Sequence, residues 1–270
     1  MKRVLIFGGN RFVGKQLSEV LVDKYQVDVF NRSGTSSDDR ISVIQGDRNN
    51  KQDIDKIDFD KYDYIVDMCL FFPSQLKLMI DLVSKKSKYI FVSSAAANSR
   101  YIDYYGDYGE DKLAVENMLV DSDLDYVIVR PSYIVGKGDH RDRLNYYLES
   151  IQNETPIKID GDGSNKINMV FSEDVVNVLN TLIKYWVQDD NRLYYICGNE
   201  SVKLIDFINH INKKYYNKNV KFDFNKKDAI FPKNDFIVCN DYTCRDLDIS
   251  FTNFYDNVKD YMEWYEISKS

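Results

Sequence analysis

Histidine is scarce in this sequence: the 270 residues include only His140 and His210. Two distant histidines and four cysteines without a C-x-x-C pair do not supply the ligand spacing of a zinc cluster. The irregular spacing of the cysteines favours reduced, mostly buried thiols over a disulfide framework. We therefore expect neither a bound metal nor disulfide bonds.

Long apolar runs and runs of basic residues are also missing. No stretch approaches the ~20 apolar residues of a membrane-spanning helix, and no signal-peptide-like segment precedes the first predicted strand. The net charge of -7 and the pI near 5.0 disfavour a general nucleic-acid or membrane-binding surface. We expect a soluble cytoplasmic protein without membrane or nucleic-acid partners.

Proline is rare (4 residues) and 44% of the residues are hydrophobic, which is typical of a compact globular chain. In the first half, short apolar runs alternate with helical patterns, which predicts βαβ units and a parallel sheet. Strands are predicted over residues 3–7, 27–30, 41–45, 64–68, 89–93 and 126–130. Helices are predicted over 14–25, 73–84 and 108–119, with a short surface helix within 49–60.

The regular alternation weakens after residue 131. Helices are predicted over 144–151, 173–186 and 202–215, and a strand over 193–196. We expect an α/β fold, a doubly wound Rossmann-type parallel sheet with a small interwoven C-terminal lobe for the substrate. The dinucleotide-binding domain would span residues 1–136 and the substrate-binding lobe 137–270, with 170–200 rejoining the sheet.

The first predicted strand, turn and helix carry the strongest chemical signal. Free backbone N–H groups and the positive end of the helix dipole meet at such a turn, which predicts a phosphate site. Gly8 would permit the tight turn, and Gly14 would let the helix pack closely on the strand. The usual fingerprint has glycine where this chain has Arg11. The candidate cofactor ligands here are Gly8, Gly9, Asn10, Arg11, Phe12, Val13 and Gly14; the alternative is a tight turn without a ligand.

The end of the second predicted strand bears on the choice of cofactor. NAD-binding units usually have an acid there, which accepts hydrogen bonds from the adenosine ribose. Here the strand ends at Asn31-Arg32. A neutral residue followed by arginine offers a cationic fork for a 2′-phosphate, and Arg11 would supply a second cation. This pattern predicts that NADP is preferred over NAD; the alternative is two solvated surface arginines.

Tyr108 and Lys112 lie four residues apart, so a helix would present both on one face. The lysine would lower the pKa of the tyrosine and hold a cofactor ribose, while Tyr108 exchanges a proton with a carbonyl or alcohol. Three other Tyr–Lys pairs share this spacing, so the spacing alone is weak evidence. Only Tyr108 opens a helix soon after a strand that ends in Ser93-Ser94, where a hydroxyl can polarise the same carbonyl.

Together these motifs resemble the extended short-chain dehydrogenases/reductases of the NAD-dependent epimerase/dehydratase family. The resemblance covers nearly the whole length, and the variant turn GGNRF with Asn31-Arg32 is most similar to the branch that includes the chloroplast stem-loop-binding proteins. Further matching segments are Gly46-Asp47 and residues 89–94, 108–116, 130–136, 161–175 and 197–207.

The resemblance implies hydride transfer to or from NAD(P), coupled to proton transfer, on a sugar-like or other small carbonyl substrate. Tyr108 would be the proton donor and acceptor, Lys112 would tune its pKa, and Ser94 or Ser93 would be the hydroxyl partner. By the same resemblance, Asp47 meets the adenine edge, Met68 lines the adenosine side, Pro131 lies beside the nicotinamide, and the catalytic helix forms a homodimer contact.

Two departures from the family pattern concern the substrate. The stretch between Ser94 and Tyr108 is short compared with that of UDP-galactose 4-epimerase-like members. Such enzymes commonly have an arginine for the substrate diphosphate where this chain has Ile167, so a nucleotide sugar is less firmly implied. Candidates to replace that arginine are Lys166, Arg141 and Arg143. The alternative function is a non-enzymatic dinucleotide-binding regulator or an RNA-binding protein.

Overall fold

The computed structural model describes residues 1–186 and 191–269, which fold into two compact units. The first, here called the sheet unit, comprises Met1–Pro131, Glu173–Ile196 and Asn240–Ile249. The second, the lobe unit, comprises Ser132–Ser172, Cys197–Cys239 and Ser250–Ser270. The functional division into a dinucleotide-binding domain and a substrate-binding lobe stays a prediction.

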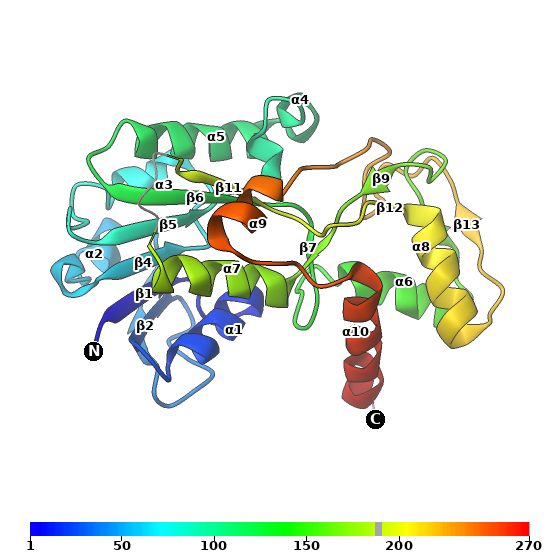
Figure 1. The fold of residues 1–270 in the computed structure, drawn as a ribbon, viewed down its shortest axis with the longest axis horizontal. Helices are drawn as coiled ribbons and strands as arrows, with labels where there is room; N and C mark the ends of the chain where they lie inside the picture. Colours follow the sequence, from blue (N-terminus) through cyan, green and yellow to red (C-terminus); the bar gives the residue numbers. More distant parts are fainter. Residues whose placement is uncertain (187–190, 270) are drawn as a thin grey trace. The chain divides into compact units, whose positions relative to one another are not determined.

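The sheet unit is built on seven parallel strands in the order β11-β6-β5-β4-β1-β2-β3 (Figure 1). The strands are β1 (Arg3–Phe7), β2 (Gln26–Asn31), β3 (Ser42–Gln45), β4 (Tyr64–Asp67), β5 (Lys88–Val92), β6 (Asp125–Pro131) and β11 (Leu193–Ile196). The chain winds outward from β1 to β3, then returns to β4 on the other side of β1. In open α/β sheets, ligands bind beyond the carboxyl ends of the strands at such a reversal. This point lies between Phe7 and Asp67, which are paired in register.

Helices cover both faces of this sheet, as expected for a doubly wound fold (Figure 1). One face carries α3 (Pro73–Lys77) and α5 (Asp107–Val120), and the other carries α1 (Phe12–Leu21) and α7 (Ser172–Lys184). Shorter elements are α2 (Lys51–Ile54), α4 (Ile102–Tyr105), α9 (Asp241–Leu247) and the 3₁₀ turns Phe59–Lys61 and Ala95–Ala97.

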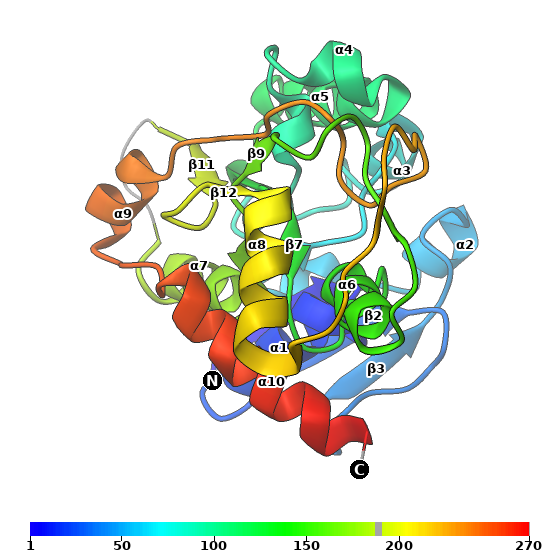
Figure 2. The same ribbon diagram turned by 90° about the vertical axis from the view of Figure 1, so that its right-hand side faces the viewer.

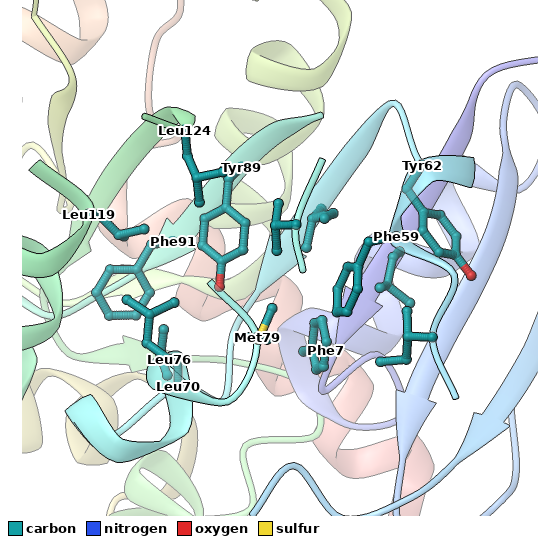
Figure 3. Close-up of a cluster of buried hydrophobic side chains, with 14 of the residues drawn as sticks. Phe7, Phe59, Tyr62, Leu70, Leu76, Met79, Tyr89, Phe91, Leu119 and Leu124 are labelled. Atoms are coloured by element: carbon teal, nitrogen blue, oxygen red, sulfur yellow. The ribbon is translucent and has the colours of Figure 1, made fainter. Parts of the chain in front are cut away.

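The core on the α5 face is a continuous apolar cluster (Figure 3). Phe7, Tyr89 and Phe91 project from the strands, and Leu76 and Leu119 project from α3 and α5 to meet them. All are buried, so the apolar periodicity of the sequence translates directly into this packing.

The six strands predicted in the first half are all present, and so is the one predicted over 193–196. The helix predicted over 73–84 was too long, since α3 ends at Lys77. Beyond it the chain continues in turns, with Ile80 N–H bonded to Leu76 C=O and Val83 N–H to Met79 C=O. Met79 and Val83 remain buried, so burial alone explains the apolar spacing without a continuous helix. Residues 170–200 were predicted to rejoin the sheet, and residues 187–190 of that segment lie outside the described residues.

The lobe unit has short strand pairs instead of a large sheet. Its strands are β7 (Ile134–Val135) with β10 (Val170–Phe171), β8 (Ile157–Lys158) with β13 (Phe222–Asp223), and β9 (Lys166–Ile167) with β12 (Val202–Lys203). Its helices are α6 (Arg143–Gln152), α8 (Leu204–Ile211) and α10 (Phe254–Lys269), seen most clearly in Figure 2. The helix predicted over 202–215 was partly wrong, because β12 precedes α8 and a π-helical turn (Asn212–Tyr216) follows it.

Aromatic side chains hold the lobe unit together. Tyr147 of α6 stacks on Phe231 with ring centroids 6.1 Å apart, and Phe207 of α8 meets Phe254 of α10 edge-on at 5.5 Å. These contacts bury Phe231 and Phe254, two of the aromatic residues of the C-terminal tail. In the described part of the chain, every helix falls short of the length and apolarity needed to cross a bilayer.

Candidate dinucleotide and active site

The glycine turn follows β1 directly and is shaped by close backbone contacts. Gly8 has φ +87°, a conformation that favours glycine, and its N–H donates to Phe30 C=O at 3.3 Å. A Cβ on Gly14 would lie 2.1 Å from Gly8 O, so α1 can begin on the turn only with glycine there. Gly9 is equally confined, packed against Val29. The sequence therefore builds a cradle that side chains would fill.

The N-terminus of α1 completes this cradle. Arg11 is the N-cap in an extended conformation and makes no side-chain cap bond. Phe12 follows with φ +47°, an uncommon value for a bulky residue, while Val13 is buried. N–H groups in the first turn of a helix lack intrahelical acceptors, and the helix dipole adds a partial positive charge. The arrangement suits an anion such as a pyrophosphate.

A small network of amides and hydroxyls joins the turn to the loop after β2. Asn10 Nδ2 donates to Ser33 Oγ at 2.9 Å and to Thr35 Oγ1 at 3.1 Å. Asn31 Oδ1 accepts from Ser33 Oγ and Gly34 N–H, both at 2.9 Å, and Asn31 Nδ2 donates to Thr35 C=O. Both asparagines thus use their side chains to shape this loop.

Arg11 and Arg32 differ from these asparagines. Both are exposed, and within residues 1–186 and 191–269 their guanidinium groups make no hydrogen bond or ion pair. Among the described residues no carboxylate neutralises them, so both cations are available to an anionic ligand.

The remaining predicted cofactor residues also lie in the sheet unit. Asp47 Oδ1 accepts from the main chain and side chain of Asn49, both at 2.9 Å. Met68 follows β4, and its Cβ would lie 3.7 Å from a Cβ on Gly8, so it borders the glycine turn. Pro131 is buried at the end of β6.

Lys112 lies in the interior, with only 2% of its surface exposed. Its ammonium donates to Leu70 C=O at 2.7 Å and to Val92 C=O at 3.2 Å, which leaves the third N–H for another acceptor. It also lies 4.9 Å from the ring centroids of both Phe71 and Phe91. Burial lowers its pKa to about 8, so it is mostly protonated at neutral pH. Tyr108, one turn earlier on α5, is 43% exposed.

The two candidate serines have different surroundings. Ser93 is buried, and its Oγ donates to the carboxylate of Glu116. Ser94 is half-buried, and its Oγ accepts from Ala96 N–H at 3.2 Å as the N-cap of the following 3₁₀ turn. Within the described chain the Ser94 hydroxyl proton has no acceptor, whereas that of Ser93 is already used.

Two buried ion pairs in the sheet unit were not singled out from the sequence. Arg130 Nε donates to Glu116 Oε1 at 2.9 Å, with a second bond from Nη2 to Oε2. Arg48 binds Asp67 through two bonds of 2.6 and 2.9 Å. The available signal was a charged residue, Asp67 or Arg130, at the end of an otherwise apolar strand, because such a charge requires a partner when buried.

In the lobe unit, the residues discussed for a substrate diphosphate are not equivalent. Ile167 is fully buried and paired with Val202, so it belongs to the core. Arg143 is tied to Asp139 at 3.0 Å. Lys166 and Arg141 are exposed.

A family model described as NAD(P)H-binding matches residues 8–154, just over half of the chain. The chain belongs to this NAD(P)H-binding family. The matched region begins at the glycine turn and includes α5. The region predicted from the sequence to bind a dinucleotide therefore lies within the part of the chain that matches this family.

Among the described residues, no three His, Cys, Asp or Glu side chains form a metal-binding group.

Solved structures of low sequence identity share the fold of this NAD(P)H-binding protein. UDP-glucose 4-epimerase of Thermotoga maritima matches with a TM-score of 0.81 and 15% identity, covering 99% of this chain and 100% of that one. UDP-glucuronic acid 4-epimerase of Bacillus cereus, in complex with NAD, has a TM-score of 0.78 and 16% identity over 94% and 93% of the two chains. An epimerase of Methanothermobacter thermautotrophicus has a TM-score of 0.79 and 18% identity over 98% and 92%. The predicted α/β fold with a doubly wound, Rossmann-type parallel sheet is confirmed.

A curated relative points to the branch named above. The chloroplast stem-loop binding protein of 41 kDa b of Arabidopsis thaliana is 24% identical over 188 residues, which is 60% of this chain. The match spans about half the length of that relative.

Proposed function

We propose that this protein is an NADP-linked oxidoreductase or epimerase that acts on a sugar-like or other small carbonyl substrate. The observation that carries the proposal is the buried Lys112 ammonium, held by two carbonyls one helical turn from the exposed Tyr108, in an NAD(P)-binding fold. An ordinary surface helix has no need of a buried lysine with a lowered pKa, whereas a proton-transfer site does.

The glycine cradle fits the pyrophosphate of a dinucleotide, because a side chain at position 14 would fill the space against Gly8 O. The main-chain N–H groups at the start of α1, at Phe12, Val13 and Gly14, would hold the phosphates. Asp47 would meet the adenine edge, Met68 the adenosine, and Pro131 the nicotinamide side. When bound, the nicotinamide supplies or accepts a hydride.

The protein side of the reaction is proton transfer. Tyr108 would give its phenolic proton to the carbonyl oxygen during reduction and take it back during oxidation. The positive charge of Lys112 stabilises the phenolate, and its third N–H would hold a ribose hydroxyl. Ser94, rather than Ser93, would donate a hydrogen bond to the substrate oxygen, because the Ser93 proton is already bound by Glu116.

Preference for NADP would come from Arg11 and Arg32, whose unpaired cations suit a 2′-phosphate. Asn10 and Asn31 support that preference indirectly, since they fix the loop that carries Arg32. In this chain the end of β2 has the neutral Asn31 in place of the usual acidic residue, so the ribose acceptor of NAD-specific units is missing there.

For the substrate, a nucleotide sugar is one candidate, since solved structures of the same fold include UDP-sugar epimerases. Exposed Lys166 and Arg141 are the groups that would meet its phosphates, while Arg143 is held by Asp139. We also propose a homodimer through α5, where Val120 is exposed. Light scattering that finds a monomer at micromolar concentration would contradict the dimer.

The primary test is turnover and cofactor affinity of Tyr108→Phe. Loss of the hydroxyl alone should lower turnover by a factor of about 10²–10⁴ and leave the Kd of NADP nearly unchanged. Ser94→Ala should lower turnover in the same way. Ser93→Ala is the matched control, expected to reduce stability more than turnover.

Two outcomes would overturn the proposal. The first is that the protein binds neither NADP(H) nor NAD(H), so that it uses no dinucleotide cofactor. The second is that Tyr108→Phe remains active, so that another group transfers the proton. A gel shift with RNA that weakens steeply with salt would favour the non-enzymatic alternative.

A further inference from the structure

The Arg48–Asp67 ion pair is buried deeply in the sheet unit. Arg48 is 7% exposed and Asp67 is fully buried, and two short bonds join them. Asp67 also accepts from Tyr89 Oη at 2.8 Å, and Arg48 lies 5.3 Å from the Phe7 ring centroid. A buried ion pair usually stabilises a fold no better than apolar residues of the same size. Its retention in an apolar core therefore suggests a role beyond stability.

The pair fixes the first residues of the segment that follows β4. Asp67 Oδ1 accepts from Cys69 N–H at 3.2 Å, which folds residues 67–69 into a tight turn. Arg48 Nη1 donates to Cys69 Sγ at 3.3 Å, so a single guanidinium holds both ends of that turn. The same turn faces the cofactor cradle, since Cys69 Cβ would lie 3.4 Å from a Cβ on Gly8.

Lys112 holds the next residue of the same segment. Its ammonium donates to Leu70 C=O at 2.7 Å, and Leu70 is itself fully buried. The four residues 67–70 thus lie between two cations, Arg48 at the carboxylate and Lys112 at the last carbonyl. Any movement of this turn would shift the acceptor that orients the Lys112 ammonium.

We propose that the Arg48–Asp67 pair is a positioning device for Lys112: it fixes the turn 67–70, whose Leu70 carbonyl aims the ammonium at the bound cofactor. The aim toward a cofactor rests on the proposed function, whereas the positioning of Lys112 does not. Arg48 and Asp67 are positioning residues, because they act on Lys112 through the main chain and through their charges.

The charges around Lys112 give the proposal a measurable signature. Asp67, Cys69 and Glu116 favour its protonated form, while Arg48 and burial disfavour it. Removing the Asp67 charge leaves the Arg48 cation uncompensated and should lower the pKa of Lys112. Removing the Arg48 cation leaves Asp67 uncompensated and should raise it. Shifts of opposite sign would show that both charges act on Lys112, and the protection of its ammonium, measured below, tests the positioning itself.

The experiment measures the pKa of Lys112 in the full-length, cofactor-free protein from the pH dependence of its ¹³Cε NMR signal, assigned with Lys112→Arg. We expect Asp67→Asn to lower this pKa by about one unit or more and Arg48→Met to raise it by a similar amount. Asp28→Asn is the matched control, since Asp28 is a buried carboxylate of the same sheet that pairs with the partly exposed Arg3 and is not among the charges that shift the pKa of Lys112. Shifts no larger than that of the control would overturn the proposal.

A second measurement covers single variants that do not fold. The double variant Arg48→Met/Asp67→Asn removes both charges at once, so it leaves no unpaired buried ion. Acetylation followed by mass spectrometry should then modify Lys112 at least about tenfold faster than in the wild type, because the turn no longer holds it. Protection equal to the wild type would contradict the proposal. Neither readout uses cofactor or substrate, so absence of dinucleotide binding would refute the proposed function and leave this result intact.

Discussion

Two pairs of arginines in the sheet unit have opposite surroundings. Arg11 and Arg32 lie exposed near the glycine turn, without a partner in the described chain. Arg48 and Arg130 lie in the interior, each bound by a carboxylate through two bonds. Arginine therefore has two uses in this unit. A buried arginine with a carboxylate partner fixes the structure, and an exposed arginine without a partner can bind a ligand.

The comparison extends to the serines and to α5. Ser93 and Lys112 are buried and bound by groups of the protein, with one N–H of Lys112 left over, whereas Ser94 and Tyr108 reach the surface. Buried charges fix geometry because leaving one unpaired is costly. Exposed groups are accessible to a ligand. We infer that the buried groups of this unit fix the geometry of the site, and that Lys112 alone among these residues also offers an N–H to a ligand.

The largest effect should come from breaking a buried pair. Arg130→Met leaves the Glu116 carboxylate unpaired in the core, so we expect the free energy of unfolding to fall by about 3–5 kcal/mol. Arg32→Met at the surface should change it by less than about 0.5 kcal/mol. Urea unfolding of the two variants measures the difference. Equal stabilities would show that burial does not distinguish the two classes of arginine.

The strands of the sheet unit could be predicted because a buried parallel strand is a continuous apolar run. Residues 3–7 gave one strand with the same bounds as β1. The helix predicted over 73–84 could not be separated from a buried turn, because Met79 and Val83 face the core in either conformation. The lobe unit was harder, since its two-residue strands are too short to show a period.

The site divides in the same way. The glycine turn and the Tyr108–Lys112 spacing are local patterns, so the sequence alone displays them. The Arg48–Asp67 pair depends on strand order, since it joins the residues after β3 to the end of β4, with β1 and β2 between those strands. Likewise, the choice between Ser93 and Ser94 depended on Glu116, which no local pattern connects to either serine.

The pH dependence of stability should reveal the buried Lys112. Its pKa is about 8 in the folded protein, below the usual value of 10.5, because burial disfavours its charge. As pH rises through 8 the folded protein releases this proton before the unfolded chain does, so stability rises until the unfolded chain also releases it. Between pH 8 and pH 10 we expect a gain of about 2 kcal/mol from this group. Urea unfolding at several pH values compares the wild type with Lys112→Met.

Other groups titrate in both proteins. The contribution of Lys112 is therefore the difference between the wild type and Lys112→Met in how much the free energy of unfolding rises. Lys112→Met has no titratable group at this position, so it should not show this rise in stability. If the free energy of unfolding changes with pH in the same way for both proteins, the pKa of Lys112 is not lowered and its ammonium is not buried.

The smallest effect concerns the exposed arginines and the choice of cofactor. Arg11→Gly restores the usual glycine at this position and removes one cation. We expect the Kd of NADP to rise about tenfold, which corresponds to about 1.4 kcal/mol. The Kd of NAD should change little, because NAD has no 2′-phosphate. Arg32→Met should act in the same direction, and calorimetric titration at low ionic strength measures both, since salt screens exposed charges.

Arg40→Met provides the matched control for this last experiment. Arg40 is also an exposed arginine of the sheet unit, but Asp38 and Asp23 already bind it. Its removal should leave the affinity for both dinucleotides unchanged. If Arg11→Gly weakens NAD and NADP equally, the turn would bind the shared pyrophosphate alone and the preference for NADP would be wrong. If Arg40→Met weakens NADP as much as Arg11→Gly does, the effect is one of net charge, and an unpaired guanidinium has no special role at this site.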